Sequence, residues 1–423
     1  MNASNSTSTP VAVGERVAVM DVLRGVALFG VFLANMTGFA HTGVMATESQ
    51  LVALPTAPWD FALHDVLRWL VTDKANTTFA FLFGLGFYLQ MRRLESRGIT
   101  FERIYRRRLS VLLVIGVLNL YLLWTWDILH LYALAGFVLL ALRGVSNRTL
   151  VVLGILCTAF GRTAQKTLSE FAGAATWTGA PDPYADPAIL ARQHLSGQGD
   201  YTGLVANFFD WVWVDYLSSG LLVGWLLYAL GRFLIGAWVG RHEWIERARD
   251  FLPGWRRVTQ WALPGGLILE GAAVLLKESP LLTDFAHREF VSNVVHLVAV
   301  PMLATGYVGA AVVLFQDERG RRLLAPFADV GRMALTNYLT QGFIVAFVLF
   351  GVGPGLGLAG RIGTCALTGI VIVAYGLQLL FSRWWLARFD YGPMEWVWRA
   401  LTYGKRPRMR IAKPPPEHTR GGG

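Results

Sequence analysis

The sequence predicts an all-α integral membrane protein, a polytopic bundle of about ten transmembrane helices. Three observations point to this class: 54% of the 423 residues are hydrophobic, only 16% are charged, and the apolar residues gather in long runs. A soluble domain carries roughly 25% charged residues, so this chain has too little polar surface to cover itself in water. The net charge of +10 follows the segments between the apolar runs, which excludes a conventional nucleic-acid-binding protein.

The apolar runs are long enough to cross a bilayer. A span needs about 20 mostly apolar residues for a hydrocarbon core roughly 30 Å thick. The second, fourth and fifth expected spans are short. Residues 61–70, with Trp59 and Trp69 near their ends, are expected to form an interfacial or re-entrant helix. The ten expected spans are residues 17–40, 76–90, 109–124, 128–142, 150–160, 216–238, 258–276, 290–315, 333–352 and 362–386.

The distribution of basic residues orients the expected bundle. Seven arginines lie between the second and third spans, and the later alternate connections are basic as well, whereas residues 163–207 hold only Lys166 and Arg192. Lys and Arg are retained on the cytoplasmic side of a membrane. The sequence therefore predicts that the N- and C-termini both face the cytoplasm.

One transmembrane domain is expected over residues 15–405, after a disordered leader (1–14) and before a flexible basic tail (406–423). Its parts 15–160 and 208–405 flank an extracytoplasmic segment, 161–207. Basic tails contact anionic lipid headgroups, so membrane lipids are expected partners. Cys157 and Cys365 lie in apolar runs and are expected to be buried free thiols.

Ionisable residues within the first span need an explanation, because a charge inside a membrane is costly unless it is paired or faces a cavity. Asp21 and Arg24 are three residues apart and can pair, while Asn35 follows Arg24 by eleven residues and shares its helix face, roughly 16 Å further along the axis. One interpretation is a polar track from an anion site at Arg24 to a hydrogen-bond donor at Asn35. The other is an interfacial ion pair plus an amide that bonds to a neighbouring helix.

Several polar groups are expected on the extracytoplasmic side, where they could converge. Asp127 precedes His130 by three residues, so its carboxylate could orient the imidazole as a general base; a helix cap beside an interfacial histidine is the alternative. Lys74 is either a donor to developing negative charge or a side chain that reaches the interface. The whole group is His41, His64, Asp65, Lys74, Asp127, His130 and His296. For His296 the favoured interpretation is a core histidine whose hydrogen bonds are satisfied.

The ninth span carries amides and hydroxyls close to a basic residue. Arg332 is followed by Thr336, Asn337, Thr340 and Gln341, which either line a ligand cavity or bond neighbouring helices together. The sequence contains no P-loop, no CxxC pair, no GxSxG elbow and no HExxH. Support for metal, nucleotide-hydrolysis and serine-hydrolase chemistry is therefore weak, and no metal cofactor is expected.

Five segments carry distinctive motifs in order along the chain: residues 19–35, Lys74 with 79–84, Asp127 to Leu129 with Tyr132, residues 330–339 and residues 392–402. Together they resemble the YeiB-like bacterial membrane proteins, which contain the domain of unknown function 418. The resemblance implies a multi-pass protein of the bacterial cytoplasmic membrane.

That family is grouped with heparan-α-glucosaminide N-acetyltransferase-like proteins, and the grouping implies acyl transfer from cytoplasmic acetyl-CoA or another acyl-CoA to an extracytoplasmic small-molecule or glycan acceptor. Asn35 matches an asparagine of the lysosomal relative. A catalytic histidine follows there by roughly ten residues, whereas His41 follows Asn35 by six. Asp127 with His130 is therefore the rival base.

The resulting hypothesis assigns a role to each candidate residue. Donor phosphates bind Arg24 and neighbouring groups, Asn35 and Lys74 donate to the thioester oxyanion, and His41 or His130 accepts the proton of the acceptor. The expected donor-binding residues are Asp21, Arg24, Arg332, Asn337 and Gln341. Two other functions stay open, a transporter of a small solute and a lipid- or quinone-binding protein, as does association into a homodimer; no nucleic-acid partner is expected.

Overall fold

The computed structural model describes residues 18–40, 45–171, 185–197, 200–278 and 285–411. Within these residues helices dominate, and an isolated β-bridge joins Phe389 and Arg410. The helices are α1 (Ala18–Ala40), α2 (Glu48–Val52), α3 (Ala57–Leu70), α4 (Lys74–Glu95), α5 (Phe101–Leu122), α6 (Leu129–Ala141), α7 (Asn147–Phe171), α8 (Asp186–Gly197), α9 (Tyr201–Val212), the π-helical turn η2 (Trp213–Ser218), α10 (Leu221–Arg241), α11 (Leu252–Glu278), α12 (Phe285–Leu314), α13 (Glu318–Arg332), α14 (Ala334–Leu349), α15 (Thr364–Leu386) and α16 (Pro393–Tyr403).

The structure confirms an all-α membrane protein. Each expected span overlaps a helix, and five helices of the described chain are long and apolar enough to cross a membrane by themselves: α1, α10, α11, α12 and α15. Three shorter apolar segments lie in α6, α7 and α14. The full number of crossings remains a proposal, because the other helices are shorter or more polar than a membrane span requires by itself.

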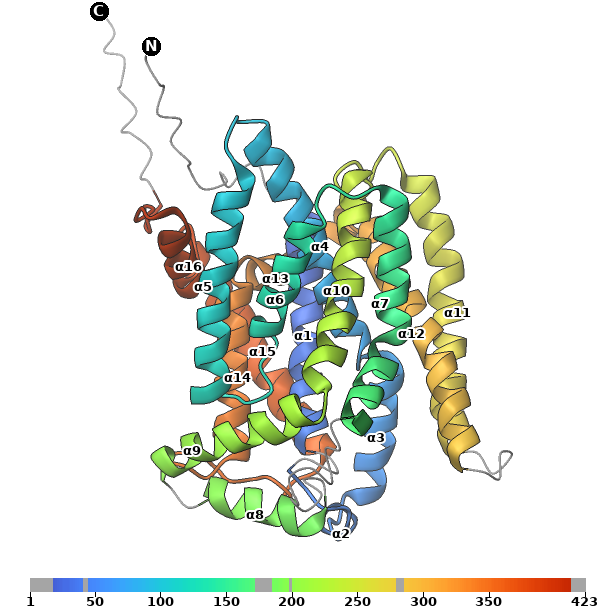
Figure 1. Ribbon diagram of the computed structural model, residues 1–423, viewed down its shortest axis with the longest axis vertical. Helices are drawn as coiled ribbons and strands as arrows, with labels where there is room; N and C mark the ends of the chain where they lie inside the picture. Colours follow the sequence, from blue (N-terminus) through green and yellow to red (C-terminus); the bar gives the residue numbers. More distant parts are fainter. Residues whose placement is uncertain (1–17, 41–44, 172–184, 198–199, 279–284, 412–423) are drawn as a thin grey trace, which may run out of the picture.

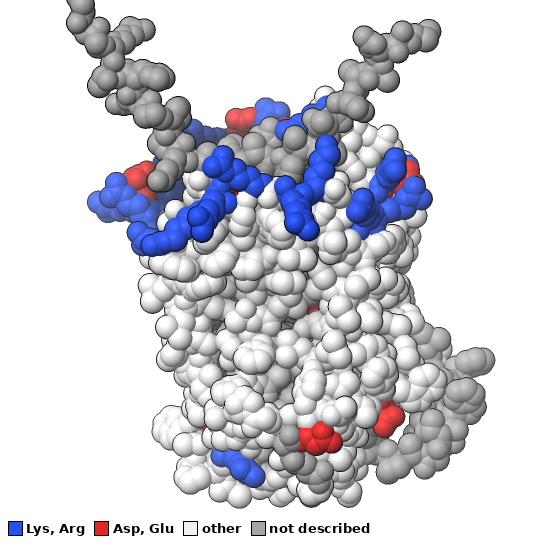
Figure 2. Space-filling model, turned by 90° about the vertical axis from the view of Figure 1, so that its left-hand side faces the viewer, with Lys and Arg blue, Asp and Glu red and all other residues white. Residues whose placement is uncertain are grey.

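Most helices run along the long axis of the molecule, with α1 inside the bundle (Figure 1). The α4–α5, α6–α7 and α10–α11 connections meet at one end, which we call the basic end; α2, α8 and α9 lie at the opposite end (Figure 1). Figure 2 shows Lys and Arg gathered at the basic end, above a side that is almost free of charge. An uncharged belt below a ring of cations is the surface expected of a protein in a bilayer.

The core is built around α1, where Leu28, Phe32 and Met36 are fully buried. Gly25 allows α13 to approach, because a Cβ there would lie 2.0 Å from the carbonyl oxygen of Phe327. Small residues allow this close backbone contact between helices in membrane proteins. The helix of the sixth expected span, 216–238, begins later than the sequence predicts. Gly220 has φ +69°, so Tyr216 lies in η2 and α10 starts at Leu221.

The segment 161–207 also differs from the single extracytoplasmic connection that we expected. Helix α7 continues to Phe171, and α8 and α9 then lie across the opposite end (Figure 1). Helix α9 buries Leu204, Phe208 and Trp211 on one face, which explains why a helix forms there. In the C-terminal region, the first residues of the expected flexible tail pack against α16, since Trp396 Nε1 donates to the carbonyl oxygen of Pro407 (2.8 Å).

Helices α3 and α4 follow one another from the opposite end toward the basic end, with a break at residues 71–73 (Figure 1). The expected interfacial helix at 61–70 thus begins earlier, at Ala57, and leads into the next helix. Asp73 has φ +66°, a left-handed conformation uncommon for residues other than glycine. The break places the first residue of α4, Lys74, inside the protein, where it is 1% exposed.

Candidate functional site

A cavity of about 260 Å³ lies near the basic end, between α1, α4, α5, α6, α13, α14 and α16. We call it the basic-end cavity. Five arginines and two carboxylates from different elements line the cavity and make its outer part polar. They are Arg24, Arg93, Arg108, Arg332 and Arg399, with Asp21 and Glu395. Clustered guanidinium groups recognise phosphate and carboxylate groups, because each presents several N–H donors in a planar fork.

Two of these arginines are held by contacts that fix their direction. Arg24 Nη1 donates to Asp21 Oδ1 (3.0 Å), one turn earlier on α1. The Arg108 guanidinium lies over the ring of Trp398, 3.8 Å from its centroid, and Trp398 Nε1 donates to the Arg108 carbonyl oxygen (3.0 Å). Ion pairing and cation–π contact reduce the conformational freedom of long side chains, so the cationic wall is preorganised.

Glu395 fastens α16 to the start of α14. Its carboxylate accepts from the backbone N–H groups of Leu335 (2.6 Å) and Thr336 (3.2 Å) and from the Thr336 hydroxyl (2.6 Å). A carboxylate at this position accepts from N–H groups that have no partner inside the helix. The positive end of the helix dipole also stabilises its negative charge. Burial raises the pKa of the Glu395 carboxyl, and the hydrogen bonds from Thr336 and Leu335 oppose that change.

Replacing Glu395 with Ala is expected to cost about 0.5–2 kcal/mol of stability, the range found for lost helix caps, and to free α16 from the cavity wall. Glu395→Gln is the matched control, because its amide oxygen still accepts from the two backbone N–H groups. Thermal unfolding together with the rate of tryptic cleavage after Arg388 measures both effects. Equal cleavage of Glu395→Ala and wild type would contradict this role.

The inner end of the cavity is formed by Leu129, Tyr132 and Tyr338. Leu129 and Tyr132 lie in the first turn of α6, which runs from there toward the basic end (Figure 1), so this part of the cavity is the deepest. Apolar side chains of α4 and α5, including Phe79 and Leu112, also line the cavity. The cavity therefore fits an elongated ligand with anionic groups at one end and a less polar group at the other.

Tyr338 connects the inner end of the cavity with the Asp127–His130 pair. Its hydroxyl accepts from the Ile128 backbone N–H (3.1 Å) and donates to Asp127 Oδ1 (3.3 Å). The Asp127 side chain is fully buried, and Asn119 Nδ2 donates to the same oxygen (2.8 Å). The carboxylate is thus held by groups from α5 and α14 as well as by its own loop.

The other Asp127 oxygen orients the histidine. Asp127 Oδ2 accepts from the His130 backbone N–H (3.0 Å) and lies 3.1 Å from His130 Nδ1. A carboxylate at Nδ1 favours the tautomer that carries its proton there, which leaves Nε2 as a proton acceptor. Within the described chain, His130 Nε2 makes no hydrogen bond, and the ring lies 5.9 Å from the ring centre of Tyr216. This geometry suits general-base chemistry.

The structure brings together some of the expected site residues. Asp21, Arg24 and Arg332 line the basic-end cavity, and Asp127 and His130 lie next to its inner end. Asn35 is half-buried on α1 and is not among the residues that line the cavity. His41 lies outside the described residues.

Asn337 and Gln341 lie between α14 and α15, outside the lining of the basic-end cavity. Asn337 Nδ2 donates to Ser382 Oγ (3.0 Å), and Gln341 Nε2 donates to Gln378 Oε1 (2.9 Å). Gln378 Nε2 completes the network by donating to the Asn337 carbonyl oxygen (3.1 Å). Of the two interpretations of this amide-rich span, the contacts match the one in which amides join neighbouring helices.

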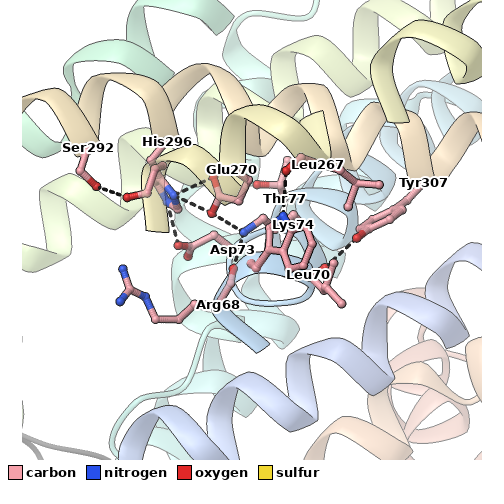
Figure 3. A network of polar contacts seen from close by, with 12 residues as sticks. Arg68, Leu70, Asp73, Lys74, Thr77, Leu267, Glu270, Ser292, His296 and Tyr307 are labelled. Atoms are coloured by element: carbon pink, nitrogen blue, oxygen red, sulfur yellow. Dashed lines mark hydrogen bonds and ion pairs between the residues drawn. The ribbon is translucent and has the colours of Figure 1, made fainter. Parts of the chain in front are cut away.

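Lys74 lies in a second polar site, which we call the buried ion cluster: Asp73, Lys74, Glu270 and His296 (Figure 3). Lys74 Nζ lies 2.5 Å from Glu270 Oε1 and donates to the Arg68 carbonyl oxygen (2.6 Å). Both side chains of this pair are 1% exposed. Lys74 therefore does not reach the interface, which was one of the two interpretations of this residue.

Several residues of the basic-end cavity are not among the site residues that the sequence predicts. Arg93 and Arg108 belong to a basic loop that indicates topology, and Trp398 and Arg399 lie in a family motif, but nothing local shows that α4, α5 and α16 meet. Glu270 was missed although it carries a detectable signal, a carboxylate inside an apolar span. Among the described residues, no group of three or more His, Cys, Asp or Glu side chains is arranged to hold a metal ion.

The fold and these sites define an all-α membrane protein with an arginine-lined cavity at its basic end. Its chain belongs to the YeiB-like DUF418 family. The family model "Protein of unknown function (DUF418)" matches residues 239–405. Uncharacterized protein YxaH of Bacillus subtilis (strain 168) is 31% identical over 94% of this chain and 97% of its own length.

Two further relatives are similar over nearly their full lengths. Uncharacterized protein YeiB of Escherichia coli (strain K12) is 30% identical over 92% of this chain and 96% of its own. An uncharacterized 39.9 kDa protein in the amylase 3′ region of Bacillus acidopullulyticus is 27% identical over 94% of this chain and 96% of its own. The family model covers the C-terminal part, which contains α16 and its cavity residues.

Proposed function

We propose that this protein is an acyltransferase of the bacterial cytoplasmic membrane, which moves an acyl group from acyl-CoA to an acceptor on the other side. The observation that carries the proposal is the continuity of two parts: an arginine-lined cavity at the basic end, and the Asp127–His130 pair joined to its inner end through Tyr338. A phosphate-rich, elongated donor such as acetyl-CoA has the charge distribution that this cavity complements.

The sidedness of the reaction follows from the charge asymmetry of the protein. Lys and Arg gather at the basic end, which the positive-inside rule assigns to the cytoplasm, where acyl-CoA is made (Figure 2). On this proposal both chain termini are cytoplasmic and the bundle has about ten transmembrane helices. Helices α8 and α9 then face the acceptor, a small molecule or a glycan.

The proposed reaction requires one general base and transfers the acyl group directly from acyl-CoA to the acceptor. His130 Nε2 takes a proton from the hydroxyl or amine of the acceptor, whose oxygen or nitrogen attacks the thioester carbonyl carbon. The carbon–sulfur bond breaks, and the CoA thiolate leaves with the proton that His130 carried. Asp127 orients the imidazole and stabilises its charged form, as carboxylates do in related triads. Asn35 stays a candidate for a donor to the oxyanion on this proposal, although it does not line the cavity. Lys74 is held away from the cavity by its pair with Glu270 and takes no part in the proposed reaction.

Replacing Arg24 with Ala is expected to weaken acetyl-CoA binding at least about tenfold, because charge-assisted hydrogen bonds contribute roughly 1.5–3 kcal/mol each. Calorimetry on the detergent-purified protein measures the affinity. Arg322→Ala is the matched control, since Arg322 is 79% exposed at the basic end and does not line the cavity. Absence of saturable wild-type binding across several acyl-CoAs would contradict the donor assignment.

Solute transport is a second candidate, favoured by a specific observation. The break between α3 and α4 lies beside buried ionisable groups of α11 and α12, and interrupted helices beside intramembrane charges are typical of ion-coupled transporters. Proteoliposomes distinguish the two functions: a transporter takes up a labelled solute unchanged and without CoA, whereas the acyltransferase releases free CoA thiol.

A further inference from the structure

The buried ion cluster joins the α3–α4 break to the α11–α12 hairpin (Figure 3). His296, on α12, lies between two carboxylates: its Nδ1 is 2.9 Å from Glu270 Oε1 and its Nε2 is 3.2 Å from Asp73 Oδ2. Glu270 is also paired with Lys74. The basic-end cavity does not include any of these four residues, so the proposed acyl transfer leaves the cluster unexplained.

The number of protons in this arrangement can be deduced from its geometry. A neutral imidazole carries one N–H, and ionised carboxylates only accept hydrogen bonds. Both ring nitrogens of His296 face carboxylate oxygens. If the imidazole were neutral, the nitrogen without a proton would point its lone pair at a carboxylate lone pair, so this geometry requires an additional proton. With that proton on His296, two cations face two anions and the cluster is neutral, which is the least costly state for buried charges.

Charged and polar groups from several elements surround the imidazole. The charged groups that face His296 are Asp73 from the break, Lys74 from α4 and Glu270 from α11. Arg68 of α3 lies close to Asp65, with 3.7 Å between Nη1 and Oδ1. Two tyrosines nearby donate to backbone carbonyls of the α3–α4 segment: Tyr228 of α10 to Asp73 (3.1 Å) and Tyr307 of α12 to Leu70 (2.9 Å).

The cluster also has an exposed side and a buried side. The side chains of Asp73 and His296 are 38% and 29% exposed, whereas those of Lys74 and Glu270 are 1% exposed. Asp73 and His296 therefore form the accessible side of the cluster, while Lys74 keeps Glu270 in place. Loss of the proton weakens the outer contact, His296 with Asp73, before the inner one.

We propose that Asp73, Lys74, Glu270 and His296 form a proton-binding site, in which the proton on His296 clamps the α3–α4 break to α11 and α12. Helix α4 begins in this cluster and also forms a wall of the basic-end cavity with Phe79, Phe83 and Gln90. Protonation of the cluster is thus linked mechanically to the cavity by one helix. The inference does not depend on what the cavity binds.

The sharpest test is Asp73→Asn. An asparagine amide can donate to Nε2 of a neutral imidazole, whose Nδ1–H then donates to Glu270, so the clamp no longer needs the additional proton. Asparagine also tolerates the left-handed backbone at this position, and the partial exposure of Asp73 favours folding of the variant. Asp65→Asn is the matched control, since it removes an exposed carboxylate of α3 outside the cluster.

Spin labels placed at Trp59→Cys on α3 and Trp261→Cys on α11, with Cys157 and Cys365 replaced by Ala, report the distance across the clamp by pulsed electron paramagnetic resonance. Both tryptophans are 74% exposed. Between about pH 6 and about pH 9, a range that includes the ordinary histidine pKa of about 6.5, the otherwise wild-type protein and Asp65→Asn are expected to show a distance shift. Asp73→Asn and His296→Gln are expected to lose that shift.

Two results would overturn the proposal: an unchanged distance in the otherwise wild-type protein, or a full shift in Asp73→Asn. Loss of the shift in Asp65→Asn would also contradict it, because the response would then not belong to the cluster. None of these measurements requires acyl-CoA, so failure of this proposal and failure of the acyltransferase proposal are separate outcomes.

Discussion

Glu270→Gln is expected to be the most destabilising single substitution discussed for this protein, at about 3–5 kcal/mol. Removing one partner of a buried ion pair leaves the other charge without compensation, and that loss is typical of such sites. Here the uncompensated group is Lys74, whose side chain is 1% exposed. The same change also removes the carboxylate that accepts from His296 Nδ1.

Unfolding of purified protein in mixed micelles measures this effect. The double variant Lys74→Met with Glu270→Leu is expected to recover part of the loss, because apolar side chains of similar size replace both charges. Glu318→Gln is the matched control. Its side chain is 60% exposed and pairs with Arg321 and Arg322 at the surface, so its cost should stay below about 1 kcal/mol. A cost for Glu270→Gln as small as that of the control would contradict the assignment of a buried pair.

His130→Ala is expected to lower acyl transfer by about 100- to 10,000-fold, the usual contribution of a general base. The affinity for acetyl-CoA should stay close to that of wild type, because His130 does not line the basic-end cavity. Assay of CoA thiol release under single-turnover conditions separates the chemical step from binding. A reduction of less than about tenfold would remove His130 from the proposed mechanism.

Asp127→Asn tests the orienting role of the carboxylate. The substitution keeps the size of the side chain but favours the wrong imidazole tautomer, so a loss comparable to that of His130→Ala is expected. His242→Ala is the control for histidine removal: His242 lies at the end of α10, where its Nδ1 is 2.9 Å from the Trp238 carbonyl oxygen, far in sequence from the proposed site. Its turnover should equal that of wild type.

The amino-acid sequence determined the class of the protein and most of its helices. Hydrophobic runs such as 17–40 and 362–386 became α1 and α15 with nearly the expected bounds, because burial in lipid requires long apolar helices whatever their neighbours. Local spacing also predicted two contacts, Asp21 with Arg24 and Asp127 with His130, since each pair lies within one turn of chain. The signals failed where Gly220 interrupts an apolar run and where α8 and α9 form without being long apolar spans.

The tertiary structure decided which polar groups meet. Lys74 and Glu270 are 196 residues apart, and Tyr338 and Asp127 are 211 apart, so no local pattern relates them. Glu395 of α16 caps α14, and Trp398 covers Arg108, only because the C-terminal helix packs against α5 and α14. A periodic pattern reports which face of a helix is apolar. The partner of a buried charge, in contrast, depends on how helices distant in sequence pack, and the cost of burying unpaired charges then selects that packing.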